Sequence, residues 1–500
     1  MEKNRLGYEK LPKLLASLAI PSIVAQLVNV LYNMVDRIYI GQMITAFTQL
    51  FGVGGAPLCA IRMGQQDEDG AEKIMTNSYV MLILCSLVLT VSILLFKRPL
   101  LFLFGAAKET IANADAYLSI YILGTISIQL TLGMNAYINT QGFAKKGMMT
   151  VLIGAAANII LDPLFIFVLD MGVSGAALAT VISQGISAFW VLKFLFGRQS
   201  VLKIRKRYFR LDRKVCLSIM ALGVSPFVMY STDGLLQIAF NSQLIRYGWT
   251  VAVATMSILT SLWQFIFLPL SGLCQGAQPI LSYNYGARDY ERVRRTFKLV
   301  FALCVLSALS TGAVMMLFPQ VFAGVFTRDK DTLSFASWAL RIYLSGTIIF
   351  GAQMACQQSF MALGQAKVSL LMAVNRKIIL LIPLLYLLPW MLKGDGLCAM
   401  LAAPVAGLVQ DGPGVFAVFL AEPVSDILSA AITTVMFMGF YRKDLILQRG
   451  SAPAPAPADA PRSSSPSRSC CTNDRICTRI DGTPPPSHTP DGHGSPRCSS

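Results

Sequence analysis

Two carboxylates stand in otherwise apolar stretches of the first half of the chain. Asp36 lies in the first apolar segment, and Asp162 lies in the run 151–169. Tyr32 is four positions before Asp36, and Asn158 is four positions before Asp162, so each pair shares one helical face. Ionisable groups inside apolar helices are costly, and they mark ion or substrate paths.

Neutral oxygen donors accompany these carboxylates. Thr180 and Gln184 are one helical turn apart in the run 176–196. Carboxylate, amide, hydroxyl and phenol oxygens suit a hard cation such as Na⁺, or a proton held between the two carboxylates. Two structural alternatives stand beside this interpretation. Asp36 is followed by an arginine and could form an ion pair at the membrane face, and Asp162 precedes a proline and could cap a broken helix.

The second half of the chain offers a further set of intramembrane acids. Asp233 lies in an apolar run, and Glu422 and Asp426 share one helical face near the end of the chain. With Gln184, they are candidates for the lining of a substrate cavity. Glu422 precedes Pro423, so it could equally cap a helix that restarts there.

The elements that position these residues are membrane-spanning helices. The chain is 54% hydrophobic and only 14% charged, well below the charge of a soluble domain. About twelve apolar runs approach the ~20 residues that a spanning helix needs, and none shows the alternation of a barrel strand. The composition therefore predicts an all-α polytopic membrane protein.

The first half of the chain recurs in the second half at a constant offset of 222 in the numbering. The matches, which continue without a gap over the range 54–145, include Gly54, Gly64 and Gly142 with Gly276, Gly286 and Gly364. Duplicated bundles of this kind are most often transporters that work at the seam between their halves. The sequence thus predicts two lobes related by an internal pseudo-two-fold repeat.

The repeat is interrupted near the first predicted span. Ala16 and Pro21 match Ala221 and Pro226 at an offset of 205, which then increases to 222. The first half therefore lacks a block of sequence that the second half has, and we expect the second span to be truncated. The predicted organisation is a six-helix lobe at 1–196, a basic linker at 197–214, a second six-helix lobe at 215–444 and a disordered tail at 445–500.

The basic residues are placed as the positive-inside rule expects for a multi-pass membrane protein. The formal net charge is +16, and the basic residues gather in alternate loops, above all in the linker at 197–214. The positive-inside rule then places both termini and the linker in the cytoplasm of a multi-pass plasma-membrane protein. Contact with anionic lipid, and not with nucleic acid, is the expected role of the linker.

The tail predicts neither a cofactor nor a metal site. It is rich in Pro, Ser and Arg and cannot bury a core. Its four cysteines and the two histidines of the chain fit no zinc spacing. The intramembrane segments, which hold no histidine, lack the ligands of a membrane metalloprotease, so an enzyme is not predicted. We expect a monomer.

Four stretches of the chain resemble the MATE (multidrug and toxic compound extrusion) family of antiporters. They are LAIPSIVAQLVNVLYNMVDRIYIG at 18–41, GVGGAPLCAIRMGQQDEDGAEKIM at 52–75, GFAKKGMMTVLIGAAANIILDPLFIF at 142–167 and FLAEPVSD at 419–426. The resemblance implies twelve helices in two six-helix lobes and the export of organic cations in exchange for Na⁺ or H⁺. It also implies that Asp36, Asn158, Asp162 and Thr180, with Tyr32 nearby, handle the coupling ion.

Two alternatives to a drug exporter stay open. A lipid-linked oligosaccharide flippase of the same superfamily would favour a basic central cavity, whereas the intramembrane charges identified in the sequence are largely acidic. A non-transporting remnant is favoured by the block that the first half lacks.

Overall fold

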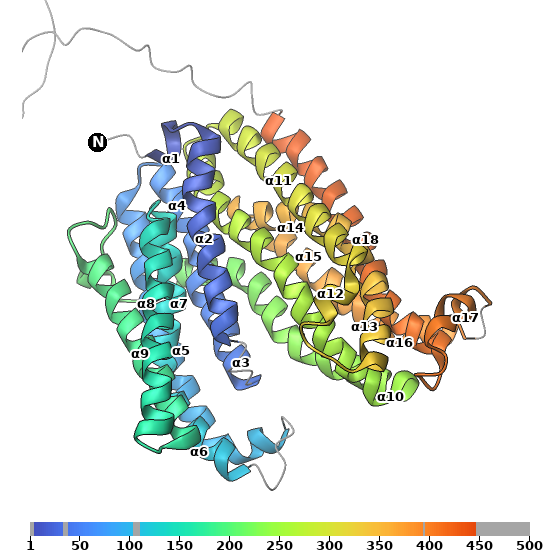
Figure 1. Ribbon diagram of the computed structural model, residues 1–500. Coiled ribbons are helices and arrows are strands. Elements are labelled where there is room, and N and C mark those ends of the chain that lie inside the picture. The colour runs from blue at the N-terminus through green and yellow to red at the C-terminus, as the bar shows by residue number, and fades with distance from the viewer. Residues whose placement is uncertain (1–4, 34–38, 104–110, 394–395, 447–500) are drawn as a thin grey trace, which may run out of the picture. The chain divides into compact units, whose positions relative to one another are not determined.

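Every regular element of the described chain is helical (Figure 1). The computed structural model describes residues 5–33, 39–103, 111–393 and 396–446. Asp36 and the tail from residue 447 lie outside these ranges, as does the side chain of Tyr32 at the end of its helix. Within them, eleven helical stretches are long and apolar enough to cross a membrane. The predicted all-α membrane class is confirmed.

The first lobe contains α2 through α9. Its spans are α2 (Leu11–Asn33); α3 (Tyr39–Thr48) continued by the π-turn η1 (Gln49–Val53) and α4 (Gly55–Gly64); α5 (Glu68–Leu103); α6 (Ile111–Tyr121) with η2 (Ile122–Gly124) and α7 (Thr125–Thr140); α8 (Ala144–Pro163) with η3 (Leu164–Val168); and α9 (Gly172–Phe196). A short helix, α1 (Arg5–Tyr8), precedes them.

The second lobe begins with α10 and ends with α18. Its elements are α10 (Arg213–Gly286); α11 (Tyr290–Leu317) and α12 (Pro319–Ala323); α13 (Lys330–Tyr343) with η5 (Leu344–Gly346) and α14 (Thr347–Ala362); α15 (Ala366–Val374) with η6 (Asn375–Leu381) and α16 (Ile382–Met391); α17 (Gly396–Ala402) with η7 (Ala403–Val405); and α18 (Gly412–Phe440) with η8 (Tyr441–Ile446).

The helix α10 accounts for two crossings. Its 74 residues would extend roughly 110 Å if straight, several times the thickness of a bilayer core. Backbone angles at Trp249 (φ 54°, ψ −156°) break it. Gly54 lies against Gly223 and Gly64 lies against Tyr283, so two distant parts of α10 flank the same short helix, α4. The chain therefore doubles back at Trp249, which brings the spans among the described residues to the predicted twelve.

The sequence duplication reappears in the backbone. Gln66 and Arg288, which correspond at the offset of the repeat, both adopt a left-handed conformation, with φ of 62° and 60°. Gly142 and Gly364, another corresponding pair, have φ of 88° and 76°. Left-handed angles are uncommon outside glycine and are set by the turn between helices. The two halves thus share their turns as well as their residues.

The block missing from the first half shortens the first hairpin at its tip. The helical stretch 39–64 is interrupted by the π-turn η1 but still contains 22 residues apolar enough to cross a membrane, Met43–Gly64. At the offsets of the repeat, Asn33 and Tyr39 correspond to Ile238 and Ser261, and α10 is helical through Gly248 and again from Thr250. Both helices of the first hairpin therefore lose length, so the truncation expected for the second span is shared between them.

The two lobes meet through glycines. A Cβ on Gly64 would overlap the carbonyl oxygen of Tyr283, and a Cβ on Gly286 would overlap that of Ile61. Ile61 corresponds to Tyr283 in the repeat, just as Gly64 corresponds to Gly286, so each lobe makes the same contact to the other. The two equivalent contacts show directly that the lobes are related by a pseudo-two-fold axis.

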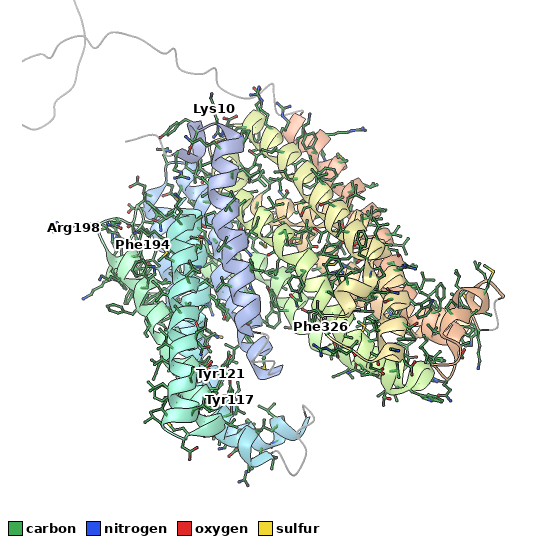
Figure 2. The ribbon with its side chains drawn as sticks, in the orientation of Figure 1. Lys10, Tyr117, Tyr121, Phe194, Arg198 and Phe326 are labelled. Carbon is green, nitrogen blue, oxygen red and sulfur yellow. The ribbon has the colours of Figure 1, made fainter. Side chains whose placement is uncertain are left out.

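We call the end of the bundle that carries this contact the basic end. Lys10, Lys146, Arg198 and Arg288 adjoin helix termini there, and Figure 2 labels Lys10 and Arg198 toward the same end. Tyr117 and Tyr121 are labelled toward the opposite end of the first lobe.

The linker between the lobes is bound to the first lobe. Glu72 of α5, almost fully buried, accepts hydrogen bonds from Arg205 Nε at 2.9 Å and from the backbone N–H of Lys203 at 3.1 Å. Asp212 caps α10 and pairs with Lys73 of α5 at 2.6 Å. The first helix of the second lobe therefore starts from a point fixed on the first lobe.

The stretch from Gly396 to Pro413 is partly helical, although its sequence gives no helical pattern. It forms the short helix α17 and lies beside the turn at Trp249, whose Nε1 donates to Gln410 Oε1 at 2.9 Å. The backbone N–H of Asp411 donates to the carbonyl of Tyr247. Tertiary contacts with the α10 turn thus accompany a structure that local sequence does not predict.

Candidate functional site

Asn158 and Asp162 form a polar pair in the first lobe. Asn158 is buried, and its Nδ2 donates to Asp162 Oδ1 at 3.2 Å along one face of α8. The helix continues through Pro163 into η3, so Asp162 does not cap a broken helix. The neighbouring helix α9, which packs against α8, carries the buried Thr180.

The other members of the predicted ion site lie outside the described residues. These are Asp36 and the side chain of Tyr32. The structure therefore brings Asn158 and Asp162 together, with Thr180 on the adjacent helix, and leaves the rest of the predicted site as a prediction. Gln184 lies one turn from Thr180, and its backbone oxygen accepts a hydrogen bond from Thr131 Oγ1 at 3.1 Å.

A second polar cluster lies in the second lobe, around Arg376. Its Nε donates to Asp426 Oδ1 at 2.8 Å, and its Nη2 donates to Glu422 Oε1 at 3.1 Å. The guanidinium is 4.7 Å from the centre of the Phe350 ring, within the range of a cation–π interaction. Because Arg376, Glu422 and Asp426 are all buried, these two carboxylates are bound into the lobe core. The helix α18 runs without a break through Pro423, and its N-cap is Asp411, so Glu422 is not a helix cap.

Lys377 extends this cluster to the start of the lobe. Its Nζ donates to the backbone oxygen of Met229 at 2.6 Å and pairs with Asp233 of α10. Lys377 is buried, whereas the side chain of Asp233 is 50% exposed. Both cations come from the π-turn η6, and such turns are frequent at functional sites.

Arg376 and Lys377 are functional candidates that the sequence reasoning missed. They lie well inside the apolar span Ala366–Met391, where the rule on ionisable groups in apolar helices would have found them. The expectation that the intramembrane charges are largely acidic was therefore wrong. In the described part of the second lobe, three predicted acids are matched by two cations.

Comparison with known proteins identifies the family. The MatE family model matches residues 39–164 and 227–387, which is more than half of the chain. The multidrug export protein MepA of Staphylococcus aureus is 25% identical over 448 residues, covering 82% of this chain and 97% of MepA. MepA of Staphylococcus saprophyticus is also 25% identical, over 429 residues, covering 79% and 93%.

A solved structure shares the fold. A MATE structure in a bent conformation superposes with a TM-score of 0.79 at 21% identity, covering 90% of this chain and 99% of that one. The two lobes, the twelve spans and the matched segments agree with the resemblance found in the sequence. The chain belongs to the MATE family of multidrug efflux transporters.

Proposed function

We propose that this chain exports organic, chiefly cationic, compounds across the plasma membrane by alternating access, driven by the inward flow of Na⁺ or H⁺. Both termini and the basic end face the cytoplasm in this proposal, as the positive-inside rule indicates. Alternating access requires that the reciprocal contact of Gly64 and Gly286 open, because it holds the lobes together at that end.

The observation that carries the proposal is the Asn158–Asp162 pair. A carboxylate hydrogen-bonded to a buried amide, in a helix long enough to span the membrane, is costly, and such a group marks a functional site. It is suited to bind and release one small cation. We assign the coupling ion to Asp162, Asn158 and Thr180, completed by Asp36 and Tyr32.

The candidates for substrate contact divide into two groups. Glu422 and Asp426 are occupied by Arg376 inside the core, so we assign them a structural role. Asp233 keeps half of its side chain exposed, and Gln184 is only partly buried. We propose that Asp233 meets substrate, whereas Gln184, whose Oε1 is buried, does not contact substrate directly.

The oligosaccharide flippase is the weaker alternative. It favours a basic cavity, and Arg376 and Lys377 could have supplied one. Their charges are, however, balanced by Asp233, Glu422 and Asp426. No net positive charge is left in the cluster to bind a lipid diphosphate.

Transport into vesicles tests the proposal. The purified chain in liposomes should accumulate a fluorescent organic cation when a sodium or proton gradient is imposed, and Asp162→Asn should abolish this while leaving substrate affinity within about tenfold, or ~1.4 kcal/mol. Asp170→Asn is the matched control, since Asp170 is exposed and has a left-handed backbone that asparagine tolerates.

Each outcome of that assay has a definite meaning. Gradient-driven uptake at the parent rate by Asp162→Asn would overturn the coupling assignment. Absence of transport by the parent itself, under either gradient, would favour the non-transporting remnant.

A further inference from the structure

A small cavity lies next to the candidate ion site, between α7, α8 and α9. Gly154 and Ala155 of α8 line it, opposite Thr131 of α7 and Gln184 and Ser187 of α9. Ala155 is three positions before Asn158, and Gln184 is four positions after Thr180. The cavity is therefore about one helical turn, or ~5 Å, closer to the basic end than the ion site.

The size and the lining of this cavity suit water. Its volume of about 20 Å³ exceeds the ~10–15 Å³ that one water requires in the same measure. Within the lining, Gln184 Oε1 is buried without a protein hydrogen-bond partner among the described residues. The Oγ of Ser183, which precedes Gln184 and is outside the lining, is also buried without a partner in the described chain. Buried polar oxygens without a protein partner are normally satisfied by ordered water.

Further polar atoms of the same kind continue toward the basic end. Asn135 is one turn beyond Thr131 on α7, and its Oδ1 is buried without a protein partner in the described chain. Trp190 is three positions beyond Ser187 on α9, and its Nε1 is likewise buried without a hydrogen-bond partner among the described residues. Asn135 Nδ2 donates to the backbone oxygen of Gly147 at 3.2 Å, in the first turn of α8.

The series ends at the surface. Lys146 Nζ, at the start of α8, lies 5.7 Å from the centre of the Trp190 ring. Buried polar atoms without a protein partner thus follow one another along α7 and α9, from about one helical turn beyond Asn158 to the basic end. A continuous apolar seam would have been the less costly way to pack these helices.

We infer that these atoms line a water path that carries protons between Asp162 and the cytoplasm, and that the coupling ion is H⁺. The inference rests on the proposed function, from which it takes the role of Asp162 and the orientation of the basic end. A proton leaves the Asp162 carboxyl group, passes along waters held by Gln184 and Thr131, and joins bulk water beside Lys146. The cavity holds about one water, too little for Na⁺ to pass with its hydration shell.

Hydroxyl-radical footprinting on the purified protein in lipid nanodiscs tests the path without reference to transport. Radicals formed from bound water should oxidise the cavity residues Leu132 and Val151 several-fold faster than Val181 and Leu192, which are also half-buried but lie outside the cavity. Equal oxidation rates for the two pairs would overturn the inference.

Substitutions at two adjacent alanines of α8 provide a second test of the water path. Ala155→Leu should fill the cavity, remove the additional oxidation and slow export driven by a proton gradient, whereas Ala156→Leu, on the exposed face of the same helix, should change neither. Gln184→Leu keeps the shape of the side chain and removes the acceptor, so it should slow proton-driven export while the protein remains folded.

The two hypotheses fail in different ways. Proton-driven export by Asp162→Asn at the parent rate would reject the coupling site, while oxidation of Leu132 and Val151 would be unaffected. Unchanged oxidation and unchanged proton-driven export in Ala155→Leu would reject the water path and leave the coupling site intact. Export that requires Na⁺ and does not respond to a proton gradient would also reject the water path.

Discussion

Lys73 Nζ lies 2.6 Å from Oδ2 of Asp212, and this ion pair joins the third span of the first lobe to the residue that caps the first helix of the second. Asp212 also accepts the backbone N–H of Lys214 at 2.8 Å. The hydrogen bond from Lys73, followed by the one from Lys214, lowers the pKa of the Asp212 carboxyl group. When the lobes move, they must either pivot at this ion pair or break it.

The pair makes stability depend on pH in a defined direction. A carboxyl group whose pKa is lower in the folded state stabilises the fold fully above its ordinary pKa, and this contribution is lost as the pH falls through the folded value. Asp212→Ala should therefore lower the Tm at neutral pH, and the difference from the parent should shrink in acid. A difference that grows as the pH falls would contradict this account.

The Gly64–Gly286 contact should tolerate no side chain. Gly64→Ala places a methyl group on the carbonyl of Tyr283, and overpacking of this kind costs about 1–3 kcal/mol. We expect the lobes to separate at the basic end. Spin labels at positions 68 and 295, both exposed and in opposite lobes, should report a longer distance. Gly439→Ala, with open space around it, should leave that distance unchanged.

Arg376 should be essential for the stability of the second lobe. Arg376→Gln leaves Glu422 and Asp426 buried without their cation, and breaking a buried ion pair in this way costs about 3–5 kcal/mol. Arg295→Gln removes an exposed pair with Glu291 and should cost less than ~1 kcal/mol. Thermal unfolding in detergent measures both, and equal effects would place Arg376 outside the core network.

A triple variant separates loss of charge balance from loss of the arginine itself. Arg376→Met combined with Glu422→Gln and Asp426→Asn removes every charge of the triad at similar volume. It should recover most of the Tm that Arg376→Gln loses, because the uncompensated buried charges are gone. A triple variant that unfolds at the same temperature as Arg376→Gln would show that the guanidinium is needed for its contacts with the rings of Phe350 and Trp263.

The shortened first hairpin should exchange its amide hydrogens sooner than its counterpart. The chain between Ile238 and Ser261 of the second lobe is several helical turns longer than the chain between the equivalent positions, Asn33 and Tyr39, of the first. Fewer packed turns leave local opening less costly. Amides in 43–64 should therefore exchange faster than those in 265–286, and equal protection in the two segments would contradict this prediction.

The sequence predicted the parts of this protein that follow periodic or repeated patterns. The twelve spans are visible as apolar runs, and the match of Gly64 with Gly286 indicated a two-fold relationship that the structure realises as a contact. Asn158 and Asp162 could be paired in advance because a spacing of four returns to the same helical face.

What the sequence could not provide was the partner of each polar group. Glu422 and Asp426 looked like a free acidic face because Arg376 is far away in the chain and joins them only after η6 packs on α18. The bond of Glu72 to Arg205 depends on the path of an irregular loop, which no periodicity describes. Long-range pairing of this kind is a property of the tertiary fold.

The reciprocal glycine contact can form only after both of its partners have been synthesised, which delays the assembly of the two lobes. Gly64 lies against Tyr283, which belongs to the second copy of the repeat. At about 5–20 residues per second, a ribosome adds that tyrosine roughly 10–45 s after the glycine. The first lobe ends with α9 at Phe196, so for roughly the last 4–17 s of that interval it is complete while Tyr283 has not yet been added. The first lobe is therefore in the membrane without its partner lobe during this time, and this is the period in which quality-control proteases can cleave it.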